Sequence, residues 1–76
     1  MIKINWDEYK IYKRSSLKED NFEILLDFIK SYYNVTGIFD IYDTLVSDEL
    51  AKMMLEKRDI ASMEGFENYM FKSSYE

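Results

Sequence analysis

The chain has 76 residues, a formal net charge of −5 and neither Cys nor His, which excludes disulfides, Cys- or His-based metal sites and imidazole general bases. A chain of this length is expected to form one domain, residues 1–76, with a thin core, because folding at this size removes only ~60% of the unfolded chain's surface from water. Its apolar content of 47% and aromatic content of 17% are high enough for a core, so disorder is not expected.

Charge and hydropathy along the chain predict a compartment and a kind of partner. Residues 1–18 carry five basic and two acidic side chains, a net +3, whereas residues 19–76 carry five basic and thirteen acidic ones, a net −8. Such an uneven field selects partners by charge. The amino terminus lacks the apolar core of a signal peptide, and no window approaches the ~18 apolar residues of a membrane span. We therefore expect a cytoplasmic protein with no membrane partner, in the host cytoplasm if a phage encodes it.

Residues 1–15 alternate apolar and polar side chains, which favours a short β-hairpin turning at Asp7 and Glu8. These two residues are poor turn formers. The competing interpretation is a helix capped by Asn5, with Glu8 three residues later. Because an isolated hairpin is not stable in water, we expect Trp6 at least to pack on the helical body.

Residues 20–33 are the predicted central helix of a helical body that spans residues 16–76. At 100° per residue the apolar side chains cover an arc wider than the ~100° stripe of a surface helix, so other elements must cover it from two or more sides. This arc consists of Phe22, Ile24, Leu25, Leu26, Phe28, Ile29, Tyr32 and Tyr33. The candidate boundary residues are Ser16 and Asp20 at the start and Asn34 and Gly37 at the end.

Two further helices are predicted after the central one. Ile38–Val46 fits a helical period better than a strand, with Thr36 as its N-cap. Residues 48–60 carry acidic side chains in the first turn and basic ones in the last, which complements the helix dipole. The predicted inner face of this helix consists of Val46, Leu50, Met53, Met54 and Ile60.

Ser62 is the candidate cap of a last helix, which Gly65 weakens by about 1 kcal/mol relative to Ala. Residues 72–76 are expected to fray. The expected fold class is therefore mainly α, with three to four helices, or α+β if the amino-terminal hairpin forms.

The nine residues Ile38–Val46, read as IFDIYDTLV, resemble the first motif of the haloacid dehalogenase-like hydrolases, in which a strand runs into Asp-x-(Asp/Tyr)-x-Thr-Leu. The resemblance implies Asp40 as the nucleophile, with Tyr42 and Thr44 at the third and fifth motif positions. That family also needs a parallel sheet with crossovers of about a dozen residues or more, and about thirty residues follow Val46. A hydrated helix face explains Asp40 better, so no enzyme is expected.

The chain offers little other site chemistry. The carboxylate pairs Asp40/Asp43 and Glu64/Glu67 lack the ~6–8 oxygen ligands that a calcium site assembles. No GxxxxGK[ST] motif is present. We therefore expect no cofactor, no metal and no small-molecule substrate.

Nucleic-acid binding has one signal in its favour, because the aromatic residues Trp6, Tyr9 and Tyr12 are interleaved with basic ones, as in single-strand binders. The net −8 of residues 19–76 repels phosphate and argues against it. The same acidic residues permit the opposite role, an acidic mimic that competes for a basic cleft.

A protein-binding module explains the composition best, because Tyr, Trp and Met are enriched at interfaces. The candidate partner-binding residues are Tyr9, Tyr12, Tyr42, Tyr69, Asp40, Asp43, Asp48 and Glu49. The expected role is that of a stoichiometric inhibitor or modulator of another protein, such as a nucleic-acid-processing enzyme. In composition the chain resembles phage and mobile-element inhibitors of the anti-CRISPR and anti-restriction type, and alternatively immunity proteins and antitoxins.

Overall fold

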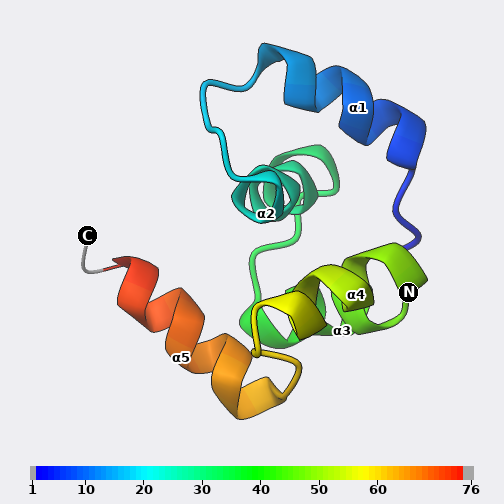
Figure 1. The fold of residues 1–76 in the computed structure, drawn as a ribbon. Coiled ribbons are helices and arrows are strands. Elements are labelled where there is room, and N and C mark those ends of the chain that lie inside the picture. The colour runs from blue at the N-terminus through cyan, green and yellow to red at the C-terminus, as the bar shows by residue number, and fades with distance from the viewer. Residues whose placement is uncertain (1, 75–76) are drawn as a thin grey trace.

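The computed structural model describes residues 2–74, in which it has five α-helices and no strand. The helices are α1 (Trp6–Ser15), α2 (Asn21–Tyr32), α3 (Ile38–Val46), α4 (Glu49–Lys57) and α5 (Met63–Ser74). Figure 1 shows α2 in the middle, with α1 on one side and α3, α4 and α5 on the other. The predicted mainly helical fold is confirmed. The prediction of three to four helices is wrong, because the amino-terminal segment adds a fifth.

The predicted amino-terminal hairpin is also wrong, because Asn5 starts a helix at that point. Its Oδ1 accepts hydrogen bonds from the amides of Asp7, at 3.1 Å, and Glu8, at 3.2 Å. Acidic residues fill the first turn of α1 and basic residues the last, which stabilises the helix dipole. Trp6, Tyr9 and Tyr12 follow one another at intervals of three, a spacing that also places them near one another on a helix.

The central position of α2 is confirmed. Its fully buried side chains, none more than 5% exposed, are Phe22, Ile24, Leu25, Leu26, Phe28 and Ile29. Asp20 caps the helix by accepting a hydrogen bond from the amide of Phe22 at 2.9 Å. Ser16 does not cap α2, because it is the C-cap of α1. Asn34 turns the chain after α2 with a left-handed φ of 56°.

Helix α3 has the predicted bounds, but Gly37 rather than Thr36 is its N-cap, with no side-chain hydrogen bond. The helical backbone of Ile38–Val46 also removes the strand that the hydrolase motif needs. Helix α4 ends three residues earlier than predicted, because Asp59 adopts a left-handed φ of 57°. The amide of Ile60 then donates to the carbonyl of Leu55, which closes a Schellman-type end.

The predicted inner face of α4 is wrong for Leu50 and Met53, whereas Val46, Met54 and Ile60 pack against the core as predicted. Ala51 and Leu55 are fully buried, whereas Leu50 is 55% and Met53 is 53% exposed. Ala51 and Leu55 are four residues apart and Met54, between them, packs against the core, so one narrow stripe of α4 faces the core. The sequence pattern favoured the larger apolar residues over this alanine.

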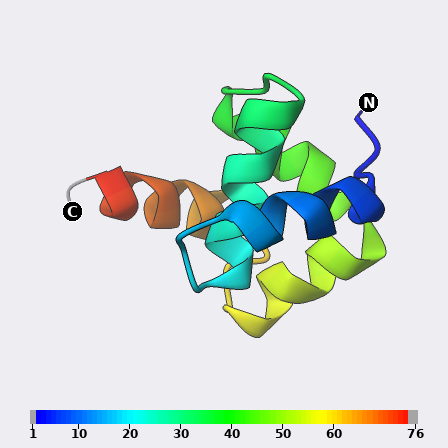
Figure 2. The ribbon, with the colours of Figure 1, turned by 90° about the horizontal axis from the view of Figure 1, so that it is seen from above.

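Helix α5 begins at the predicted cap, because the amide of Gly65 donates to Ser62 Oγ at 3.0 Å. A Cβ on Gly65 would lie 3.0 Å from the same oxygen, so the small residue suits this turn and the gain expected from Ala does not apply. The helix extends to Ser74, and residues 75–76 lie outside the described residues, so the fraying expected for residues 72–76 stays a prediction. Figure 2 shows α5 pointing away from the other helices. No helix within residues 2–74 has the length and apolar character needed to cross a membrane.

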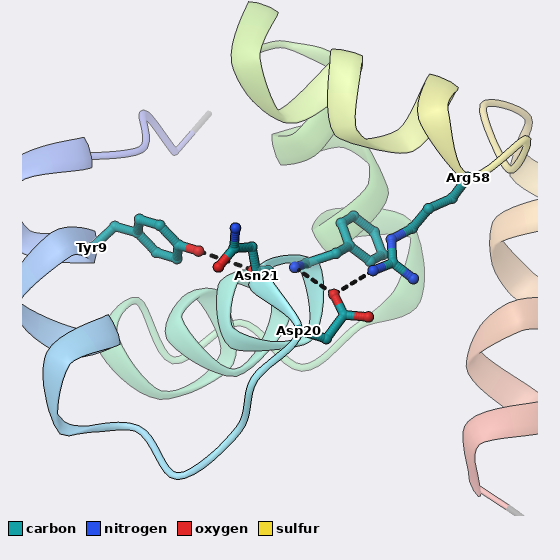
Figure 3. Close-up of polar contacts among 5 residues, drawn as sticks. Tyr9, Asp20, Asn21 and Arg58 are labelled. Carbon is teal, nitrogen blue, oxygen red and sulfur yellow. Dashed lines mark hydrogen bonds and ion pairs between the residues drawn. The ribbon is translucent and has the colours of Figure 1, made fainter.

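Figure 3 shows the contact that ties the end of α4 to the start of α2, in which the guanidinium of Arg58 reaches the carboxylate of Asp20. The same guanidinium lies 5.0 Å from the ring centroid of Phe22. Beside it, the hydroxyl of Tyr9 donates to the carbonyl of Asn21 at 2.9 Å. The hydrogen bond from Arg58 is the main reason that the pKa of Asp20 is below its usual value.

This contact predicts a loss of stability in acid. A carboxylate whose pKa is lower in the folded state stabilises fully above its unfolded pKa, and the contribution disappears as pH falls through the folded pKa. We expect Arg58→Gln to lower the free energy of unfolding by up to about 1 kcal/mol at neutral pH, since both side chains are about one-third exposed. Near pH 2 the part of this deficit that depends on the Asp20 carboxylate should disappear, which leaves only the contact of Arg58 with Phe22.

Urea unfolding at the two pH values measures this difference. Lys57→Gln is the matched control, because Lys57 is an adjacent exposed cation without an ion pair to another described residue. An Arg58→Gln deficit that persists unchanged in acid would contradict the assignment.

Candidate partner-binding surface

Two hollows adjoin at the amino-terminal segment, residues 2–5, which precedes α1 and belongs to no helix or strand. The larger, of about 570 Å³, lies between this segment and the start of α4. The smaller, of about 430 Å³, lies between Ile2, the loop after α2 and one side of α3. Ile2 lines both of them. We call this the Ile2 surface, and its main residues are Ile2, Lys3, Trp6, Asp40, Asp43, Asp48, Glu49 and Leu50.

The amino-terminal segment is fixed to α2 by a tyrosine. The hydroxyl of Tyr33 accepts a hydrogen bond from the amide of Asn5 at 2.8 Å and donates to the carbonyl of Lys3 at 3.2 Å. The side chain of Ile4 is buried in the core at 5% exposure. The segment is thus one wall of the hollows and keeps its position through these contacts.

Tyr33→Phe should therefore lower the free energy of unfolding by about 1 kcal/mol, because the amide of Asn5 loses its partner. The emission of Trp6, the only Trp in the chain, should also change, because this residue follows the released segment. Tyr32→Phe is the control: it lies next to Tyr33, and its hydroxyl makes no hydrogen bond within residues 2–74. Equal effects of the two substitutions would show that the hydroxyl of Tyr33 does not hold the segment.

Asp48 connects the amino-terminal segment to α4. One carboxylate oxygen, Oδ1, caps α4 by accepting from the amides of Leu50 at 3.0 Å and Ala51 at 3.1 Å. The other oxygen, Oδ2, accepts from the indole Nε1 of Trp6 at 3.0 Å. Both oxygens are thus engaged inside the protein, so Asp48 contributes charge and support to the surface rather than a direct contact.

The other three acidic candidates point a strong negative charge outward. Asp40, Asp43 and Glu49 are exposed, and their carboxylates make no hydrogen bond or ion pair with other described residues. No Lys or Arg occurs in residues 31–51. Lys3 is the only basic residue that lines either hollow within the described chain. The surface is therefore suited to a partner with positive charge.

Apolar side chains lie beside these carboxylates. Leu50 lines the larger hollow and is 55% exposed. The half-buried side chains of Trp6 and Ile2 line the same hollow. On α3, Phe39 is 70% exposed and lies one turn before Asp43. Exposed apolar residues surrounded by charge are typical of a surface that buries against another molecule.

The structure does not bring the four candidate tyrosines together with this surface. Tyr9 is 6% exposed, and burial, followed by the charge of Asp20, raises the pKa of its hydroxyl. Tyr12 packs on Phe28, Tyr42 on Phe66 and Tyr69 on Phe22, with ring centroids 5.4–5.8 Å apart, so these three are half-buried at separate edges of the core. The four acidic candidates, by contrast, all line the Ile2 surface.

The sequence did not identify four residues of this surface as partner-binding, namely Ile2, Lys3, Trp6 and Leu50. Trp6 and Leu50 belong to segments more than forty residues apart, and the indole contact with Asp48 spans 42 positions. No local pattern predicts such a meeting. The exposed position of Leu50 depends on the rotation of α4, which its sequence pattern misplaced.

Comparison of the chain with known protein families, curated proteins and solved structures found no match. Within residues 2–74, no group of three or more acidic side chains is placed to hold a metal ion. The aromatic platform expected for single-stranded nucleic acid is not formed, because Tyr9 is buried and the indole of Trp6 is bonded to a carboxylate.

Proposed function

We propose that the protein is a binding module that joins another protein through the Ile2 surface in a fixed stoichiometry and modulates that partner. The observation that carries this proposal is the meeting of four carboxylates with an exposed Leu50 around two adjoining hollows, against the single cation of Lys3. Complementary charge steers association, and apolar contacts in the centre supply affinity.

A protein partner is favoured over a nucleic acid by the charge of this surface. Phosphate is repelled by Asp40, Asp43 and Glu49, and a duplex carries one negative charge per about 1.7 Å of its axis. An exposed leucine is also better suited to an apolar side chain of a protein than to a phosphate backbone.

The inhibitory role stays a prediction. The protein would be an inhibitor if its partner is a nucleic-acid-processing enzyme, as for anti-CRISPR and anti-restriction proteins. It would also be one if its partner is a toxin, as for immunity proteins and antitoxins. In each case the module would act by occupying a basic surface that the partner needs, without chemical change to either protein.

The test is charge reversal on the Ile2 surface. The tagged protein is used to isolate a partner from a lysate of the source organism, and the affinity of the two purified proteins is then measured by calorimetry. We expect the triple variant Asp40→Lys, Asp43→Lys, Glu49→Lys to bind at least about tenfold more weakly, which is 1.4 kcal/mol or more. Asp48 is left unchanged because it caps α4.

The matched control reverses three exposed carboxylates on other parts of the molecule, Glu19, Glu56 and Glu64. It changes the net charge by the same amount, so a loss shared equally by both variants would point to a general charge effect and against the Ile2 surface. Circular dichroism of each variant establishes that its helices are intact.

A further inference from the structure

We infer that the larger hollow of the Ile2 surface takes up an extended segment of the partner protein that carries an aliphatic side chain next to a Lys or Arg. This inference rests on the proposed function and adds the chemistry of the bound segment. It depends on three features of the hollow: its backbone wall, its apolar lining and its charge.

The backbone wall favours an extended segment. Asn5 has an extended backbone, with φ −92° and ψ 100°, and residues 2–4 before it belong to no helix or strand. The amides of Lys3 and Ile4 and the carbonyl of Ile4 make no hydrogen bond to other described residues. Such unpaired main-chain groups can pair with the main chain of an extended partner segment, as the edge of a sheet does. Tyr33 and the buried Ile4 hold this template in place before any partner arrives.

The lining favours an aliphatic anchor. The hollow of about 570 Å³ lies within the size range of ligand pockets, roughly 300–1,000 Å³, so it can take side chains rather than a flat contact. Its apolar lining comes from the amino-terminal segment, the start of α1 and the start of α4, and consists of Ile2, Ile4, Trp6 and Leu50. Aromatic and aliphatic residues in such a pocket are the usual centre of a binding site.

The charge around the hollow favours a neighbouring cation. Glu49 lies on its rim, and Asp40 and Asp43 line the smaller hollow on the other side of Ile2. A guanidinium or ammonium group beside the anchor meets exposed carboxylates on either side of Ile2, and charge-assisted hydrogen bonds to carboxylates are roughly twice as strong as neutral ones.

Synthetic peptides test this directly on the intact protein. The first probe is a peptide of about ten residues made of Lys, Leu and Thr, chosen for an extended backbone. The second has Glu in place of Lys, the third has Ser in place of Leu, and the fourth probe is a thymidine oligonucleotide. Binding is followed by the emission of Trp6, since none of the probes contains Trp, and by amide signals in NMR spectra.

We expect the Lys/Leu peptide to shift the emission of Trp6 and the amide signals of Lys3, Ile4 and Leu50. The Glu peptide and the oligonucleotide should bind at least about tenfold more weakly, and the Ser peptide several-fold more weakly. Leu50→Ala should weaken the Lys/Leu peptide, whereas Met53→Ala should not, since Met53 is equally exposed on α4 but does not line the hollow.

The inference is overturned if the Glu peptide or the oligonucleotide binds as tightly, if the shifts lie away from this hollow, or if no peptide shifts these signals at millimolar concentration. Those results leave the proposed function standing when the Asp40/Asp43/Glu49 reversal still releases the protein partner. Conversely, the Lys/Leu peptide could bind in this hollow while the charge reversal leaves the affinity for the protein partner unchanged. That pair of results refutes the proposed function and not the inference about the hollow.

Discussion

Phe28→Ala should lower the free energy of unfolding by about 3–5 kcal/mol, which is the usual cost of removing a buried phenylalanine ring. Phe28 is fully buried and lies at the centre of the packing between α1 and α2. Four tyrosine rings surround it at centroid distances of 4.9–5.8 Å, namely Tyr9, Tyr12, Tyr32 and Tyr33. The substitution leaves a cavity and removes aromatic contacts worth about 0.5–1.5 kcal/mol each beyond their buried area.

A domain of this size has little stability to lose, since ~5–15 kcal/mol is typical of proteins in general and small domains are marginal. We therefore expect Phe28→Ala to be largely unfolded well below the urea midpoint of the parent protein, as measured by the helical circular dichroism signal. Phe39→Ala is the control with the same chemical change at a position that is 70% exposed, and it should stay within about 0.5 kcal/mol of the parent. Similar losses for the two variants would contradict the central place of α2.

Local signals account for the parts of the fold that the sequence predicted. These parts depend on residues within a few positions of one another. They are the broad apolar arc of α2, the helix caps and the left-handed backbone of Asn34, with Asp20, Asp48 and Ser62 as the caps. Such short-range rules identified the α3 bounds and placed the start of α2 to within a residue.

The errors in the predicted fold have two causes. One segment fits the period of a strand and that of a helix, and in α4 the larger apolar residues were taken for the buried ones. Residues 1–15 alternate apolar and polar side chains as in a strand, but Trp6, Tyr9 and Tyr12 within them also recur at helical spacing, and the cap by Asn5 decided for the helix. In α4 the small Ala51 is fully buried whereas the larger Leu50 is 55% exposed, so the size of the apolar residues did not indicate which side of the helix faces the core.

The candidate site was predictable in its charge but not in its assembly. The four acidic candidates are conspicuous in the sequence because no basic residue lies between them, and they are Asp40, Asp43, Asp48 and Glu49. Their meeting with Ile2 depends on contacts between distant segments, such as the hydrogen bond from Asn5 to Tyr33 across 28 positions. The tyrosines, chosen by residue type, lie instead at the edges of the core.

Asp48→Ala should have the second-largest effect, a loss of about 1.5–3 kcal/mol in the free energy of unfolding. Removing the N-cap of α4 costs about 0.5–2 kcal/mol. Removing the acceptor of the half-buried Trp6 indole costs a further 1 kcal/mol or so. The emission of Trp6 should shift to longer wavelength in the folded variant, because water replaces the carboxylate beside a ring that has lost its anchor.

Asp48→Asn separates the two contributions. Its amide oxygen can still cap α4, since Asn is as good an N-cap as Asp, but its NH₂ group then faces the indole Nε1 of Trp6, which is also a donor. We expect this variant to keep most of the stability of α4 and yet to show the altered Trp6 emission. Asp43→Ala removes an exposed carboxylate about one turn before Asp48. It should change neither the free energy of unfolding nor the emission of Trp6. If instead Asp48→Ala left the emission of Trp6 unchanged, the amino-terminal segment would be held without α4, and the two walls of the larger hollow would move independently.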